Sequence, residues 1–169
     1  ISRRYNSNSY LHRFDGLTMT LNTTIRQAQL EDLDNLAELF NAYRLFYQQA
    51  DDFNLGRKFL AERLSRRDST LFVATTLAGK LVGFAQLYPI FSSLSAKKAW
   101  ILNDLYVLPE SRQAGAATGL IQKSIAFCRE HQASWISLQT AQDNFQAQKL
   151  YEKIGFVRDE HYWTYVLEL

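Results

Sequence analysis

The sequence contains only one cysteine, Cys128, and three histidines among its 169 residues. A single cysteine excludes an internal disulfide framework, and a free thiol is typical of a reducing compartment, so we expect a cytoplasmic protein. The histidines lie far apart, with no cysteine or carboxylate at the spacing of metal ligands, so we expect no metal site. We find no apolar segment followed by a small-residue cleavage site, so a secretion signal is not predicted.

The sequence also has little net charge, with 19 Lys and Arg against 17 Asp and Glu. Residues 1–18 carry the whole excess of +2, which leaves residues 19–169 neutral. A neutral domain has no general attraction to nucleic acid or to an anionic membrane, and we expect neither as a partner. Residues 1–18 show no steady period and are predicted to form a flexible or appended arm before a single domain, residues 19–169. A basic nucleic-acid tether is the alternative for this arm, although its three arginines are sparse.

One apolar stretch, residues 71–91, is long enough to suggest a membrane span because Lys80 is its only charge. However, Ala78, Gly79 and Lys80 form a predicted turn between two runs rich in valine, phenylalanine, leucine and threonine. Each run has the length of a strand, so the stretch predicts a hairpin of buried strands rather than a membrane helix.

Apolar spacing alternates between strand and helix periods along the domain. The predicted elements are, in order, a strand at 23–26, a helix from about 31, a helix at 55–67, the hairpin at 71–91, a strand at 98–107, a helix from 115, a strand at 135–139, a helix at 144–154, and two strands from 156 onward and at 162–167. Cys128 falls on the apolar face of the third helix and is predicted to be a core residue.

The segment 102–124 predicts a phosphate site, because a loop with Arg112 and Gly115 joins the end of a strand to the start of a helix. Unpaired N–H groups and the helix dipole favour an anion there, Gly115 allows close approach, and Thr118 adds a hydroxyl donor. The segment lacks the lysine of a nucleoside-triphosphate loop and the three glycines of a dinucleotide fingerprint. A helix-capping loop of small residues is the alternative interpretation.

Two motifs of the sequence resemble those of the GNAT acetyltransferases and occur in the same order as in that family. Residues 112–117 (RQAGAA) resemble the family's (Q/R)-x-x-G-x-(G/A) loop, and residues 144–156 (NFQAQKLYEKIGF) resemble its N-x-x-A-x-x-L-Y-x-x-x-G-F signature. The resemblance extends from about residue 24 to residue 169. The segments QLYPIFSS and WILNDLYV are similar to a bacterial branch of the family related to histone and polyamine acetyltransferases.

The resemblance implies an α/β (α+β) fold: a mixed, mostly antiparallel sheet of six to seven strands with splayed central strands, and about four helices. It also implies acetyl-CoA as co-substrate, without a metal, and a small-molecule or peptide amine as acceptor. A homodimer that pairs through the C-terminal strands is expected. The implied acetyl-CoA-binding residues are Leu105, Tyr106, Val107, Arg112, Gln113, Ala114, Gly115, Ala116, Ala117, Thr118, Asn144 and Tyr151.

The same resemblance implies roles in the reaction. The N–H of Leu105 is expected to donate to the thioester oxygen, where negative charge builds, and Tyr151 to protonate the departing thiolate. Related enzymes often carry a glutamate base on the central strand, whereas this sequence has Asn103 and Asp104. We therefore predict Asp104, or a chain of waters, as the base; a loop-holding or substrate-binding role for Asp104 is the alternative.

Aromatic residues followed by two carboxylates, Asp51 and Asp52, suggest where the acceptor amine binds. The first helix ends in Phe40, Tyr43, Phe46 and Tyr47, and Tyr88 begins the loop before the central strand. Ring faces and carboxylates can hold an ammonium group, so Phe40, Tyr43, Tyr47, Tyr88 and Asp104 are the predicted acceptor residues. For each aromatic residue taken singly, packing in the core is the alternative.

The sequence lacks a Ser-His-Asp signature and a nucleophile elbow, so direct attack by the amine in a ternary complex is expected. A non-catalytic coenzyme-A-binding sensor or assembly module of the same fold is the alternative, because Asn103 departs from the family's pattern.

Overall fold

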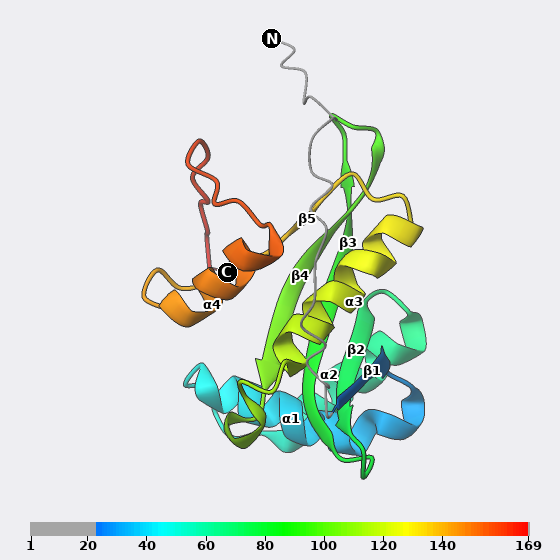
Figure 1. Cartoon of the computed structure of the whole chain (residues 1–169). Coiled ribbons are helices and arrows are strands. Elements are labelled where there is room, and N and C mark those ends of the chain that lie inside the picture. The colour runs from blue at the N-terminus through cyan, green and yellow to red at the C-terminus, as the bar shows by residue number, and fades with distance from the viewer. Residues whose placement is uncertain (1–22, 169) are drawn as a thin grey trace.

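A five-stranded mixed sheet forms the centre of the protein in the computed structural model, which describes residues 23–168 (Figure 1). The strands are β1 (Thr23–Gln27), β2 (Thr70–Thr76), β3 (Leu81–Ser92), β4 (Lys97–Val107) and β5 (Ile136–Ser137), and they lie side by side in chain order. Neighbouring strands from β1 to β4 are antiparallel, whereas β5 runs parallel to β4. β4 therefore occupies the position where the pairing changes from antiparallel to parallel.

Helices cover both faces of the sheet. On one face lie α1 (Leu33–Phe46) and α2 (Phe53–Arg66), and on the other lie α3 (Ala116–Glu130) and α4 (Phe145–Ile154). Two short 3-10 helices, η1 (Leu30–Asp32) and η2 (Pro109–Ser111), precede α1 and follow β4. The side chains of β3 alternate between the two layers, so that Phe84 packs under α1 while Ala85 and Leu87 pack under α3.

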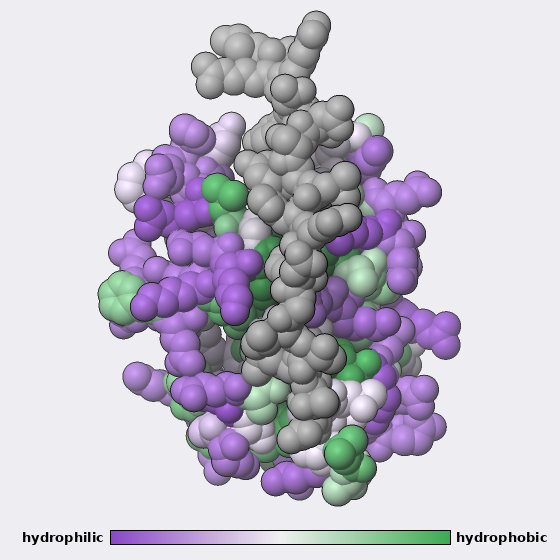
Figure 2. Space-filling model, viewed as in Figure 1, coloured by the Kyte–Doolittle hydropathy of each residue, from purple (hydrophilic) through white to green (hydrophobic). Residues whose placement is uncertain are grey.

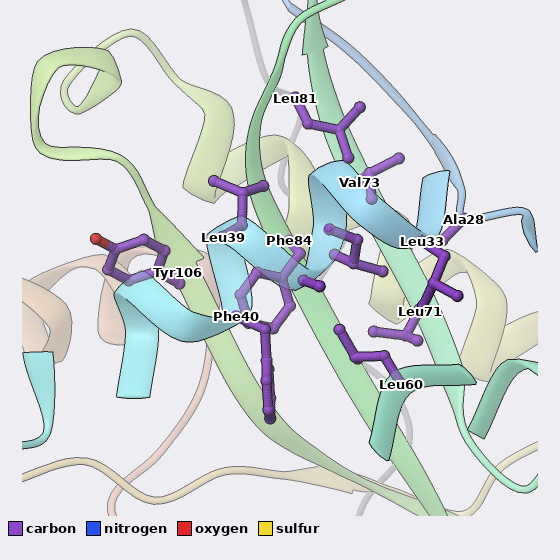
Figure 3. Close-up of a cluster of buried hydrophobic side chains, with 12 residues drawn as sticks. Ala28, Leu33, Leu39, Phe40, Leu60, Leu71, Val73, Leu81, Phe84 and Tyr106 are labelled. Atoms are coloured by element: carbon purple, nitrogen blue, oxygen red, sulfur yellow. The ribbon is translucent and has the colours of Figure 1, made fainter. Parts of the chain in front are cut away.

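The core beneath α1 contains a set of large apolar side chains (Figure 3). Phe40 lies among them next to Phe84, with ring centroids 6.0 Å apart, and stacks on Phe59 of α2 at 5.6 Å. Gly56 allows α2 to approach, because a Cβ atom at this position would be 3.1 Å from Cδ1 of Phe40. The pair α1 and α2 is therefore held to β3 by close ring packing.

Side-chain hydrogen bonds fix the connection between α1 and α2. The amide of Asn41 donates to Asp51 at 2.7 Å and accepts from the N–H of Asp52 at 3.2 Å. The Asp52 carboxylate then accepts from the N–H of Leu55 at 2.9 Å and caps α2. Asn41 thus connects the C-terminal half of α1 to the residues that directly precede α2.

Most of the predicted elements are confirmed, including the turn at Gly79, which adopts a φ of 81°. The two C-terminal strands are wrong, because residues 155–168 contain no strand. β-strand propensity reflects the fit of a side chain to a partly buried pleated surface. Trp163 and Tyr165 are 86% and 91% exposed, and β5, with two residues, offers too short an edge to pair with. The predicted dimer, which relied on those strands, stays a prediction.

Hydrophilic residues predominate on the described surface that Figure 2 shows, with smaller hydrophobic areas between them. Within residues 23–168, no helix combines the length and the apolar character needed to cross a membrane. The apolar stretch 71–91 forms β2, the turn and β3, as predicted.

Candidate functional site

A cleft of about 420 Å³ lies where the ends of α1 and β4, the start of α3, and α4 meet. Its walls come from elements far apart in the sequence, and Figure 1 shows α4 set to the side of β4. The lining residues are Tyr43, Phe46, Tyr47, Leu102, Asn103, Leu105, Tyr106, Val107, Ser111, Arg112, Gln113, Gly115, Ala116, Ala117, Thr118, Gln139, Thr140, Asn144, Gln146, Ala147, Leu150 and Tyr151.

One wall of the cleft is an open edge of β4. β5 pairs with Trp100 and Ile101 only, so the following residues, 102–107, have no strand partner on that edge within the described chain. Main-chain groups on an unpaired edge are available to hydrogen-bond an extended ligand. The sheet therefore presents a binding strand to the cleft.

The direction of the β4 amides follows from the pairing on the other edge. Asn103 is an extra residue that interrupts the register between β4 and β3. Past this bulge, the N–H of Leu108 donates to the carbonyl of Val82 on β3 at 2.9 Å. Because the N–H groups of successive residues point to opposite edges of a strand, Leu105 and Val107 direct theirs to the open edge.

The second wall is the loop that leads into α3. Gln113 and Gly115 adopt left-handed backbone conformations with φ of 63° and 84°. α3 begins at Ala116, and its first intrahelical hydrogen bond runs from the N–H of Gly119 to the carbonyl of Gly115. The N–H groups of the preceding turn are therefore free of intrahelical partners and favour an anion. Small side chains at Ala116 and Ala117 leave that space open.

Arg112 connects this loop to α1 as well as to β4. Its Nε donates to the carbonyl of Val107 at 3.0 Å. Its guanidinium group lies 5.7 Å from the ring centroid of Phe46 and 5.9 Å from that of Tyr106. The cationic group thus stands at the border between the loop and the aromatic end of α1, where a cation and ring faces attract each other.

α4 contributes two predicted residues to the opposite wall. The Asn144 side-chain oxygen accepts from the N–H of Ala147 at 3.2 Å and caps the helix. Tyr151 is half-buried on the next turns, and its ring packs edge-on against Phe156 at 6.0 Å. Burial, and to a lesser extent Tyr47, raises the pKa of the Tyr151 hydroxyl, so this phenol stays protonated at neutral pH.

Asp104 lies behind the cleft rather than on its surface. It is 5% exposed, and Oδ1 accepts from the Tyr43 hydroxyl at 2.7 Å and from Nδ2 of Asn103 at 3.1 Å. Burial raises the pKa of its carboxyl, although the two hydrogen bonds oppose this shift. Tyr43 lines the cleft, whereas Asp104 does not. The Tyr43 hydroxyl therefore lies between the cleft residues and the Asp104 carboxylate, to which it donates a hydrogen bond.

The structure places the other predicted residues as follows. Tyr47 lines the cleft with Tyr43, and their rings meet edge-on with centroids 5.0 Å apart. Phe40 stands about one helical turn before Tyr43 and two before Tyr47, on a similar face of α1. It therefore lies in the core, where its ring packs between Phe84 and Phe59. Tyr88 is half-buried on β3 outside the cleft lining; burial, followed by the charge of Asp104, raises its pKa to about 12.

Of the predicted loop residues, only Ala114 is absent from the cleft lining. Several lining residues were not predicted from the sequence, among them Gln139, Thr140 and Gln146. The first two lie two and three residues past the end of β5, and the carboxyl ends of adjacent parallel strands meet at one edge of a sheet. That positional rule would have pointed to Gln139 and Thr140.

Comparisons with known proteins extend over most of this domain. A family model described as "Acetyltransferase (GNAT) family" matches residues 33–156. "Uncharacterized N-acetyltransferase YhfO" of Bacillus subtilis (strain 168) is 40% identical over 145 residues, covering 86% of this chain and 97% of that protein. A "Probable acetyltransferase" of Haemophilus influenzae is 31% identical over 130 residues, covering 77% and 87% of the two chains. A crystal structure of a probable acetyltransferase superposes with a TM-score of 0.82 at 45% identity, covering 86% and 97%.

Proposed function

Because the chain belongs to the Acetyltransferase (GNAT) family, we propose that it transfers the acetyl group of acetyl-CoA to a primary amine. One observation carries this proposal: the open edge of β4, the start of α3 and Tyr151 all border the same cleft. These three features offer, in order, main-chain donors for an extended arm, donors for phosphate, and a proton donor. Their combination suits a long co-substrate with phosphates at one end and a thioester at the other.

The residues of the cleft fit acetyl-CoA in their chemistry. Gly115 has no side chain to block the loop, and the unpaired N–H groups at the start of α3 would hold the pyrophosphate. The amides of Leu105 and Val107 would pair with the pantetheine arm along the open edge. Nδ2 of Asn144, which makes no hydrogen bond to any residue between 23 and 168, adds a further donor.

Two groups would act on the reacting atoms. The N–H of Leu105 would donate to the thioester oxygen, where negative charge builds as the amine attacks, and a fixed main-chain dipole stabilises that charge. The hydroxyl of Tyr151 would give its proton to the sulfur as the carbon–sulfur bond breaks, which a phenol can do because it is not ionised at neutral pH.

The amine would attack directly in a ternary complex, without an acyl-enzyme. The free thiol among the described residues, Cys128, is buried on the core side of α3, and burial raises its pKa to about 11. A thiol of that pKa supplies little thiolate at neutral pH, so it is a poor nucleophile. A base is instead needed to take a proton from the incoming ammonium group, and Asp104 or a chain of waters is predicted for it.

The Tyr151→Phe variant tests the role of the acid. We expect kcat to fall about 100-fold or more, because general acid catalysis contributes roughly 10²–10⁴-fold, while the affinity for coenzyme A changes only a few-fold. Tyr162→Phe is the matched control, because Tyr162 is 84% exposed on the C-terminal segment. A Tyr151→Phe enzyme with the kcat of the unaltered protein would remove Tyr151 from this role.

A non-catalytic coenzyme-A-binding module makes a different prediction. Asn103, which lines the cleft where a carboxylate base would be expected, is the feature that favours it. Coenzyme A would then raise the melting temperature of the protein, while no amine in a broad panel would be acetylated.

A further inference from the structure

Asp104 is a buried carboxylate that has no cationic partner in the described part of the chain. It is 5% exposed, and no lysine or arginine within residues 23–168 forms a salt bridge with it. An unpaired buried charge is costly, and proteins usually neutralise it with a cation or a proton. Here the carboxylate is held by only the hydroxyl of Tyr43 and the amide of Asn103.

The groups around Asp104 come from three elements. Tyr43 lies on α1, and Tyr47, next to it, caps the end of that helix; Tyr88 comes from β3; Asn103 precedes Asp104 on β4. A more distant ion pair, Arg63 with Asp68 at 2.8 Å, lies on the side of Tyr88. The immediate surroundings therefore consist of phenol hydroxyls and a side-chain amide.

Tyr43 is the contact between this carboxylate and the cleft. Its hydroxyl donates to Oδ1 of Asp104 at 2.7 Å, a short hydrogen bond of the kind formed with an ionised acceptor. The same residue lines the cleft, whereas Asp104 does not. A tyrosine oxygen that donates one hydrogen bond can still accept another from a group in the cleft.

We propose that Tyr43 relays a proton from the acceptor's ammonium group to Asp104, so that these two residues together serve as the base. This inference rests on the proposed N-acetyltransferase function. Tyr43 would be the catalytic residue that touches the amine, and Asp104 would act through it as a positioning and proton-accepting residue. It replaces the expectation that Asp104 touches the substrate.

The proton transfer balances as follows. An N–H bond of the ammonium group breaks and its proton moves to Oη of Tyr43, while the original Tyr43 proton moves to Oδ1 of Asp104. The amine becomes neutral, the carboxylate becomes a carboxylic acid, and Tyr43 stays a neutral phenol throughout. Burial and the adjacent Asp104 raise the pKa of Tyr43, which agrees with a phenol that transmits a proton without ionising. After product release, Asp104 returns its proton to solvent by the same path.

The relay predicts a loss that depends on pH. For the fastest acceptor in a panel of alkyl primary amines, Tyr43→Phe and Asp104→Asn should each lower kcat/KM about 100-fold or more near pH 7. The loss should shrink to about 4-fold or less near pH 10, because roughly a quarter to a third of an amine with a pKa of roughly 10.4 is then already deprotonated, against less than about 0.1% at pH 7. In the unaltered enzyme, activity should fall as the pH drops through the pKa of Asp104, because the protonated acid can no longer accept a proton.

Asp32→Asn is the matched control for Asp104→Asn. Asp32 is 7% exposed and accepts hydrogen bonds as Asp104 does, but it lies in η1 outside the cleft lining. We expect this variant to keep its kcat/KM at every pH at which it is folded. Circular dichroism and coenzyme A binding, measured on each variant, report whether the fold and the cleft are retained.

Three outcomes would overturn the relay. The first is an unchanged kcat/KM in Tyr43→Phe, and the second is an equal loss at all pH values, which indicates a structural hydrogen bond. The third needs no variant and can be tested even if both variants fail to fold: it is a dependence of kcat/KM on pH, in the unaltered enzyme, that follows only the pKa of the amine. The absence of amine acetylation by the unaltered protein would instead refute the proposed function itself.

Discussion

The substitution Gly83→Ala tests the packing that positions the open edge of β4. Gly83 lies on β3 opposite Val107, next to the main chain that borders the cleft. A Cβ atom at this position would lie 2.7 Å from the carbonyl oxygen of Tyr106 and 3.0 Å from Cγ2 of Val107. The first contact is with main chain that cannot rotate away, so β4 itself must move.

We expect this displacement to cost about 2 to 3 kcal/mol, within the range for an overpacked core position. For a domain of this size, that corresponds to a melting temperature lower by roughly 5 to 10 °C. Coenzyme A should also bind more weakly, because the shift displaces the main chain at Tyr106 and Val107. Urea unfolding with an unchanged m-value and calorimetric titration with coenzyme A measure the two effects.

Gly56→Ala is the matched control. Its Cβ would approach Cδ1 of Phe40 at 3.1 Å, but the residue lies inside α2, where alanine gains about 1 kcal/mol of helix propensity. We expect its stability to stay within about 1 kcal/mol of the unaltered protein, with full coenzyme A affinity. A Gly83→Ala variant as stable as Gly56→Ala would refute the described packing of β3 on β4.

Two further predictions concern the stability of the fold. Asn144→Ala removes the cap of α4 and should cost about 1 kcal/mol in urea unfolding, as should the equivalent cap change Asp52→Ala in α2; no loss in either would contradict the capping geometry. Arg26 binds Asp32 through two hydrogen bonds of 2.7 Å, which lower the pKa of the Asp32 carboxyl from its ordinary 3.8. The ion pair stabilises the fold fully above pH 3.8, and this stabilisation is lost as the pH falls through the lowered pKa of Asp32. Because the arginine is partly exposed, Asp32→Asn should cost about 1 to 2 kcal/mol of unfolding free energy at pH 7. The variant should also lose less stability than the unaltered protein as the pH is lowered below about 4. An Asp32→Asn variant whose free energy of unfolding falls with acid as steeply as that of the unaltered protein would contradict this role of the ion pair.

The sequence predicted much of the fold because its strongest signals are local. Helical spacing in residues 33–46, the turn at Gly79 and the stop at Gly155 each act within a few residues, and the structure confirms them. The family resemblance, which rested on two motifs in order, is confirmed as well. The C-terminal strands were predicted from apolar spacing, but a strand also needs a partner edge, which the spacing of side chains does not reveal.

The site was only partly predictable for a related reason. Loop and helix-start residues between Arg112 and Thr118 could be located because consecutive residues form that wall. The hydrogen bond between Tyr43 and Asp104 joins residues 61 positions apart, and no local pattern indicates it. Spacing alone also could not decide which aromatic residues at the end of α1 face the cleft: Tyr43 and Tyr47 do, whereas Phe40 enters the core.

Initial-velocity measurements of coenzyme A thiol release, with acetyl-CoA and an alkyl primary amine both varied, test the proposed reaction most directly. Direct attack in a ternary complex predicts that release requires both substrates and that the double-reciprocal lines intersect. Parallel lines would indicate an acyl-enzyme and contradict direct attack. No release with any amine, from a protein that coenzyme A nevertheless stabilises, would contradict the proposed N-acetyltransferase activity.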